Sequence, residues 1–169
     1  MQQGNLVKKE EEVKPTEGSE SLQSIVQALV LKGDLSGLTQ VQKVECYNKF
    51  CSRLGLDPLT QPFKLLKLNG KETLYLDRSG AQQLSRLYEL SHTIVSRQAN
   101  MELGVYEVVV RATTPEGRVM DSVGIVNITG LKGDAYANAT MEAETKAKRR
   151  ATLDILGIGL LDETEMDGE

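Results

Sequence analysis

The chain alternates between stretches whose apolar residues recur at helical spacing and stretches whose apolar and polar residues alternate. A period of about 3.6 residues indicates a helix that buries one side, whereas strict alternation indicates a strand with one buried face. In chain order the patterns predict helices, a β-hairpin, a helix, three strands and a long final helix. We therefore expect an α+β fold in which an antiparallel hairpin and a three-stranded sheet pack against the long C-terminal helix, with additional N-terminal helices.

Two helices are predicted before the hairpin. Residues 21–31 carry apolar side chains at helical spacing, and Gly33 stops this run. Thr39 is a predicted N-cap of the second helix, Gln42 completes a capping box three residues later, and Gly55 ends the helix. The side expected to face the core carries Val41, Val44, Tyr47, Phe50 and Leu54.

The segment from Phe63 to Leu76 predicts a hairpin, because two apolar-rich runs flank Asn69-Gly70, which favours a two-residue type I′ turn. Pairing around this turn places Leu68 opposite Lys71. The expected core face consists of Phe63, Leu65, Leu74 and Leu76. The other face is a basic and partly aromatic strip, suited either to a phosphate backbone or simply to water, and consists of Lys64, Lys71, Thr73 and Tyr75.

The next elements are a helix and three strands. Asp77 is the predicted N-cap of a helix that runs to about Leu90. Alternation then predicts strands at 92–97, 105–113 and 118–128. The side of the helix that is expected to face inward carries Ala81, Leu84, Leu87 and Tyr88.

The most distinctive feature of the sequence is a helix predicted over residues 134–156. Alanine recurs at every fourth position along it, which allows another backbone to pack closely against Ala135, Ala139, Ala143, Ala147 and Ala151. Lys146, Arg149 and Arg150 share one side, and Lys148 lies across from them. This densest cationic cluster of the chain suits a phosphate backbone, and it equally suits cations that offset the helix dipole near a C-terminus.

Composition and charge add a domain organisation. The 169 residues are 40% hydrophobic, enough for one core, and they contain neither a membrane-spanning run nor a signal peptide. We expect a disordered arm at 1–20, a single domain at 21–161 and an acidic tail at 162–169. The net charge of −4 argues against nucleic acid at first sight, but the arm carries −2 and the tail −5, which leaves +3 on the domain.

The residues that most often carry chemistry predict no catalytic site. Cys46 and Cys51 point about 140° apart on one helix, so we expect two buried free thiols, as in a reducing cytosol. His92 is the only histidine, and it is expected to be a satisfied or exposed strand residue. Neither a metal site nor a catalytic triad is predicted, and the chain contains no phosphate-binding loop for ATP. We expect no cofactor and no enzymatic activity.

Two segments carry a family resemblance: GLDPLTQPFKLLKLNGKETLYLDRSGAQQL and NATMEAETKAKRRATLDILGIGLLDETE. Together they resemble bacteriophage single-strand annealing proteins of the RecT, Redβ and ERF superfamily. RecT-like chains have a similar turn, hairpin and helix that opens with Asp. ERF-like chains, and the annealing domain of the eukaryotic double-strand-break repair recombinase, have a similar basic helix that runs into glycines. The resemblance covers roughly residues 38–165.

The resemblance implies assembly of many subunits into rings or helical filaments, with DNA in a basic groove. The residues that match the family's basic helix are Lys148, Arg149 and Arg150. The eukaryotic relatives continue with another arginine about one turn later, whereas this chain has Asp154.

These observations lead to the hypothesis of ATP-independent single-stranded DNA binding and annealing in phage homologous recombination and DNA repair. The expected DNA-binding residues are Lys146, Lys148, Arg149 and Arg150 on the long helix, with Lys64, Lys71, Tyr75 and Arg78 on the opposite wall. The expected partners are single-stranded DNA, further copies of the chain, and a phage exonuclease or host single-strand binding protein, in the cytoplasm of a host bacterium. The alternative is a structural or interaction protein that oligomerises through its alanine-striped helix without DNA affinity.

Overall fold

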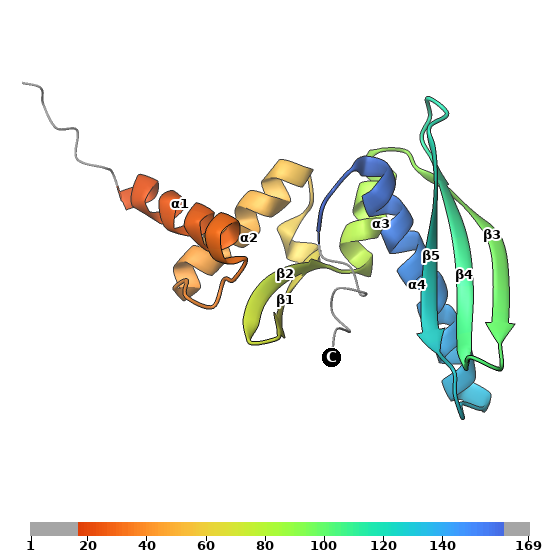
Figure 1. Cartoon of the computed structure of the whole chain (residues 1–169). Helices are drawn as coiled ribbons and strands as arrows, with labels where there is room; N and C mark the ends of the chain where they lie inside the picture. The colour runs from red at the N-terminus through yellow and green to blue at the C-terminus, as the bar shows by residue number, and fades with distance from the viewer. Residues whose placement is uncertain (1–16, 161–169) are drawn as a thin grey trace, which may run out of the picture.

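The chain folds around one long helix, α4, which is shared by two sheets and two hydrophobic cores (Figure 1). The structure, a computed structural model, describes residues 17–160. Within that range the predicted α+β fold is confirmed. The elements are α1 (Glu17–Gln27), η1 (Ala28–Lys32), α2 (Gln40–Leu54), η2 (Pro58–Thr60), β1 (Phe63–Leu68), β2 (Lys71–Leu76), α3 (Arg78–Leu87), β3 (Ser91–Asn100), β4 (Val105–Thr113), β5 (Val119–Asn127) and α4 (Gly133–Leu156).

The first helix begins earlier than the sequence pattern predicts. Residues 17–20, which we assigned to a disordered arm, form the first turn of α1. The sequence pattern misses this turn, because it contains no apolar side chain. Its last turn widens into the π-helix η1, and Gly33 ends it in the left-handed conformation at φ 58°. The remainder of the predicted arm and the acidic tail lie outside the described residues.

The N-cap prediction for α2 is confirmed, and three of the five residues expected to face the core pack against it. Thr39 and Gln42 form the reciprocal capping box. Cys46 and Cys51 are buried free thiols, as expected, and burial raises the pKa of both. Tyr47, Phe50 and Leu54 pack against the core that contains both cysteines, as expected. Val41 and Val44, in the first two turns of the helix, are exposed, in contrast to our expectation.

The hairpin has the predicted register around its turn. Leu68 pairs with Lys71, and Asn69 and Gly70 both have positive φ angles, as a type I′ turn requires. Three of the four expected core residues are buried: Phe63, Leu74 and Leu76. Leu65 is 42% exposed, contrary to expectation, although it pairs with the buried Leu74.

The hairpin is held against the N-terminal helices by a short polar network. The Asp34 carboxylate accepts hydrogen bonds from the backbone N–H groups of Glu72 and Ser36, both at 2.9 Å. These bonds, with the Glu72 contact as the largest cause, lower the pKa of Asp34 to about 2. The backbone N–H of Leu35 donates to the carbonyl of Glu72, and Lys43 forms an ion pair with the Glu72 carboxylate. Residues distant in sequence thus fix the start of β2.

Helix α3 begins where the sequence predicts and ends one turn earlier. The Asp77 carboxylate accepts from the backbone N–H of Gly80 at 3.1 Å, which confirms the N-cap. Ala81 and Leu84 are buried, whereas Leu87 and Tyr88 are largely exposed, contrary to expectation. The helix ends at Leu87, so its last turn extends past the core that Ala81 and Leu84 contact.

The second sheet has the order β3-β4-β5, and α4 covers one of its faces. Four alanines of the predicted stripe are buried at this contact, namely Ala139, Ala143, Ala147 and Ala151. Ala135 is exposed, because it lies in the first turn of α4, before the buried part of the stripe begins. Among the described residues, no helix is long and apolar enough to cross a membrane.

Helix α4 also closes the first core. Its last turns place Leu153 among the apolar side chains of the hairpin and α3, while Ile155 lies in the core under the sheet. Gly157 ends the helix in the left-handed conformation at φ 66°. The hairpin and N-terminal helices lie on one side of α4 and the sheet on the other (Figure 1).

The contact between α4 and β5 depends on the missing side chain of Gly124. A Cβ atom there would lie 2.2 Å from the Ala143 carbonyl oxygen and 2.5 Å from the Ala147 nitrogen. Because both are backbone atoms, we expect Gly124→Ala to lower the free energy of unfolding by about 2 kcal/mol or more. Urea denaturation measures this loss, with Gly37→Ala as control, since nothing lies within 4 Å of a Cβ at that position. Equal unfolding midpoints for both variants would contradict the close packing.

Candidate nucleic-acid interface

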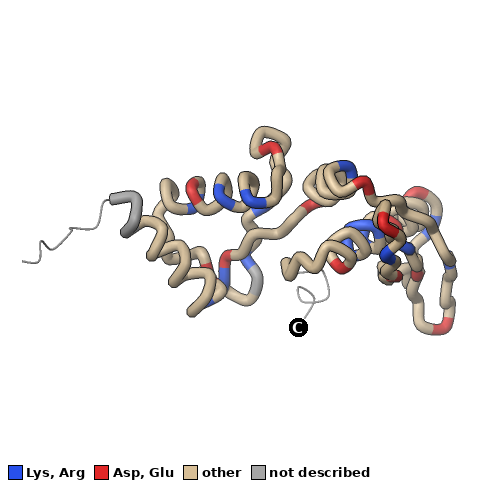
Figure 2. Tube along the Cα trace, turned by 90° about the horizontal axis from the view of Figure 1, so that it is seen from above, with Lys and Arg blue, Asp and Glu red and all other residues tan. Residues whose placement is uncertain are grey.

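The four cations of α4 do not form one surface, because neighbouring helical positions face different elements. The cations of α4 lie at positions 146–150, after Glu142 and Glu144 and before Asp154; Figure 2 colours the acidic and basic positions of the chain. Lys146 forms an ion pair with Glu142 at 3.2 Å, and Lys148 forms one with Glu144 at 2.7 Å. Each glutamate lies one helical turn before its lysine. Arg149 and Arg150 turn toward the two opposite sides of the helix.

Arg149 is buried between α4 and the hairpin. Its side chain is 2% exposed, and its Cζ atom lies 4.5 Å from the centre of the Tyr75 ring. Its Nη1 lies 3.5 Å from the carbonyl oxygen of Leu76, at the junction of β2 and α3. A guanidinium held on an aromatic face inside the fold contributes to packing and cannot also reach a strand that passes over the surface. Tyr75, expected on a binding wall, is the platform for this contact.

Arg150 is part of the contact between α4 and the sheet. Its Nη1 donates to the carbonyl oxygen of Val123 on the edge strand β5 at 2.8 Å. One turn later, Asp154 accepts a hydrogen bond from the buried Ser122 hydroxyl of the same strand. Asp154 therefore connects α4 to the sheet of the same chain.

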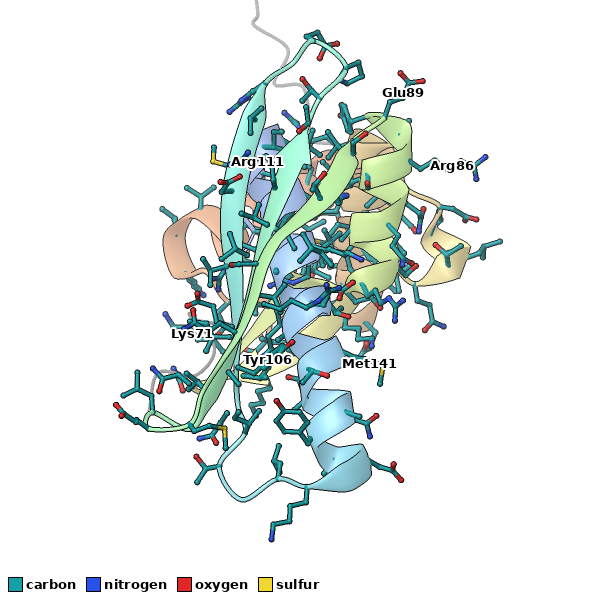
Figure 3. The ribbon with its side chains drawn as sticks, turned by 90° about the vertical axis from the view of Figure 1, so that its right-hand side faces the viewer. Lys71, Arg86, Glu89, Tyr106, Arg111 and Met141 are labelled. Atoms are coloured by element: carbon teal, nitrogen blue, oxygen red, sulfur yellow. The ribbon has the colours of Figure 1, made fainter. Side chains whose placement is uncertain are left out.

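A cavity of about 370 Å³ lies between α3, α4 and the start of β3, and we call it the α3–α4 cavity. Three of the eight residues that the sequence suggests for DNA binding line it: Arg78, Lys148 and Arg149. The other described residues of its lining are Ala81, Gln82, Ser85, His92, Met141, Glu144, Thr145 and Thr152. Met141 projects from α4 on the side of α3, and Tyr106 lies on the other side of the helix, toward the sheet (Figure 3).

The charges on this cavity are predominantly positive. Arg78 is exposed at the first position of α3, and the Lys148 side chain is 46% exposed. The carboxylate among its described lining residues, Glu144, pairs with Lys148 and with Arg97 of β3, the latter at 2.8 Å. These two hydrogen bonds, with Lys148 as the larger cause, lower the pKa of Glu144. An anion that enters would meet two exposed cations, Arg78 and Lys148, in the lining of the cavity.

Arg97 is a residue that the sequence pattern misses. Strict alternation along β3 from His92 would turn Arg97 to the outer face of the sheet. A register shift between Ile94 and Ser96 reverses the alternation, so Arg97 pairs with the buried Val108 and shares the inner face with His92. No turn residue or glycine marks this bulge in the sequence.

The hairpin cations lie elsewhere. Lys64 pairs with the capping carboxylate of Asp77 at 3.6 Å, and Lys71 lies at the hairpin turn, near the carboxylate of Asp34. Neither lines the α3–α4 cavity. The expected opposite wall is therefore provided by α3, through Arg78, and not by the basic strip of the hairpin.

His92 is a satisfied residue, as expected, in the wall of the cavity. Its Nε2 lies 3.0 Å from the Thr152 hydroxyl and its Nδ1 lies 3.4 Å from the Ser85 hydroxyl. Burial, and secondarily the charge of Lys148, lower the pKa of its imidazole below the ordinary value of 6.5. The ring is therefore neutral near neutral pH, and it adds no positive charge to the cavity there.

Two comparisons of the sequence with known proteins find no match. No protein-family model matches the sequence, and a search of curated proteins finds no significant match.

The burial of Arg149 predicts a structural cost that an exposed arginine does not have. We expect Arg149→Ala to lower the free energy of unfolding by about 2–5 kcal/mol, because it removes a large buried side chain and its contacts with Tyr75 and Leu76. The matched control is Arg78→Ala on the cavity rim, for which a change within about 0.5 kcal/mol is expected. Urea denaturation followed by circular dichroism distinguishes the two. A negligible loss for Arg149→Ala would place its side chain at the surface in solution.

Proposed function

We propose that the chain binds single-stranded DNA along the phosphate backbone at the α3–α4 cavity and anneals complementary strands without ATP. The observation that carries this proposal is the cavity itself, where Arg78, Lys148 and Arg149 converge from two helices. Arg78 and Lys148 provide the accessible charge, while Arg149 holds the hairpin against α4 beneath them. Each phosphate neutralised releases condensed counterions, which gives an affinity that is independent of sequence and falls with salt.

The chemistry of annealing supports the same cavity. Two strands approach one another once their phosphates are neutralised, and their bases must stay free to pair. Proteins that sequester single strands usually stack bases on aromatic side chains. Apart from the imidazole of His92, the described lining of the cavity contains no aromatic ring. Its volume, at the lower end of the usual 300–1,000 Å³ of ligand sites, suits a short segment of one strand.

Assembly into a homo-oligomer is part of the proposal, because many weak sites along one strand reinforce one another. The alanine stripe does not provide the contact between subunits, since four of its five residues are covered by the sheet of the same chain. The uncovered outer face of the sheet is the better candidate, with Val119 and Ile125 each about half exposed. In this proposal the protein acts in phage recombination in a bacterial cytoplasm, alongside an exonuclease or a host single-strand binding protein.

The two exposed cations of the cavity, Arg78 and Lys148, predict how the affinity for single-stranded DNA depends on salt. We expect Arg78→Ala and Lys148→Ala each to reduce the slope of log Kd against log salt by about 0.7, the contribution of one contact on a single strand. Fluorescence anisotropy with a labelled oligothymidine measures the slope, and annealing of complementary oligonucleotides without nucleotide measures the activity. Both variants are expected to slow annealing as well.

Lys49 provides the matched control. It is 47% exposed and paired with Glu45 one turn away on α2, as Lys148 is paired with Glu144 on α4. Lys49→Ala should leave the slope and the annealing rate unchanged. If the unmodified protein shows no affinity for oligothymidine even at low salt, the proposal is rejected and a structural or interaction role is favoured. Equal effects of Lys49→Ala and Lys148→Ala would remove the α3–α4 cavity from the proposal.

A further inference from the structure

The cavity wall contains a group that can change its charge within the physiological pH range. His92 is the only histidine of the chain, and its imidazole lies among Arg78 of α3 and Lys148 and Arg149 of α4. On its own strand Arg97 shares the inner face, and the facing carboxylate is that of Glu144. The Glu144 carboxylate stays charged between about pH 5 and 8, because hydrogen bonds from Lys148 and Arg97 lower its pKa.

The hydrogen bonds of His92 define its neutral form. The Thr152 hydroxyl donates its proton to the backbone carbonyl of Lys148 at 2.9 Å, so it can only accept from His92. Nε2 of the imidazole therefore carries the proton, and Nδ1 is the acceptor that faces the Ser85 hydroxyl.

The same network can accommodate the charged form. The Ser85 hydroxyl lies 3.4 Å from Nδ1 of His92 and also 3.4 Å from the backbone carbonyl oxygen of Leu90. When Nδ1 is protonated it donates to the Ser85 oxygen, and the serine proton turns to Leu90. Neither protonation state leaves a ring nitrogen without a partner. Protonation therefore requires no rearrangement of the helices or strands around the ring.

We propose that His92 is a proton-linked part of the cavity, which holds a proton more tightly when a phosphodiester backbone binds there. In the free protein, burial and Lys148 disfavour the imidazolium. A phosphate placed in the cavity beside Arg78 and Lys148 neutralises part of the repulsion from Lys148 and adds an attractive negative charge. This inference rests on the proposed function. Protonation of His92 makes strand binding stronger in mildly acidic solution.

The sign follows from linkage. Binding raises the pKa of His92 from a value below 6.5, so the complex holds more protons than the free protein. The gain in affinity is fully present below the pKa of the free protein and is lost as the pH rises through the pKa of the complex. A rise of one pKa unit on binding corresponds to about a tenfold gain in affinity.

The experiment measures the Kd of labelled oligothymidine at constant ionic strength from about pH 8 to pH 5.5, a range in which phosphodiesters keep their charge and an imidazole titrates. We expect the Kd of the unmodified protein to fall about tenfold over this range. For His92→Gln, whose amide can still donate to Thr152, we expect the Kd to change much less over the same pH range. Circular dichroism at each pH verifies that the variant is folded.

A second measurement needs no variant. Because the chain has one histidine, its imidazole gives a single set of NMR signals, and their titration with and without oligothymidine reports the pKa directly. An upward shift on binding supports the proposal. Strand binding with an unchanged imidazole pKa overturns the role of His92 but leaves the proposed function intact. An absence of strand binding at every pH overturns both.

Discussion

The architecture depends on how closely α4 approaches the three-stranded sheet. A helix of alanines on that side and a glycine on β5 remove the side chains that usually keep a helix and a sheet apart. The backbones of Gly124 and Ala143 then meet almost directly, and the helix settles deep against the sheet. With that side of α4 occupied, its opposite side is available to the hairpin and α3, so one helix organises two separate cores.

This arrangement determines what the basic residues of the helix can do. Consecutive positions on a helix point about 100° apart, so Arg149 and Arg150 diverge toward the hairpin and toward β5. Each joins α4 to one of its two neighbours. Lys148 is the member of the cluster that combines exposure with a place in the α3–α4 cavity, where Arg78 joins it from the next helix. A cluster that is continuous in sequence is therefore divided in space between assembling the fold and forming a cavity.

The parts of the fold that follow from local chemistry are predictable from the sequence. Thr39 and Asp77 cap their helices through their own side chains, and Asn69-Gly70 fixes the hairpin register. The candidate site is less predictable, because it depends on which face of an element another element covers. Arg149 is buried because its guanidinium packs on the ring of Tyr75, and these two residues are far apart in sequence. His92 shows the same limit, since its partners Ser85 and Thr152 come from two different helices.

The bulge in β3 has a consequence for how such a cavity changes during evolution. Because side chains in a strand alternate between faces, one residue more or less ahead of Arg97 moves its guanidinium from the inner face of the sheet to the outer one. The residue itself need not be replaced. Single-codon insertions and deletions in this strand are therefore a route by which related chains gain or lose a cation at the cavity while their composition stays nearly constant.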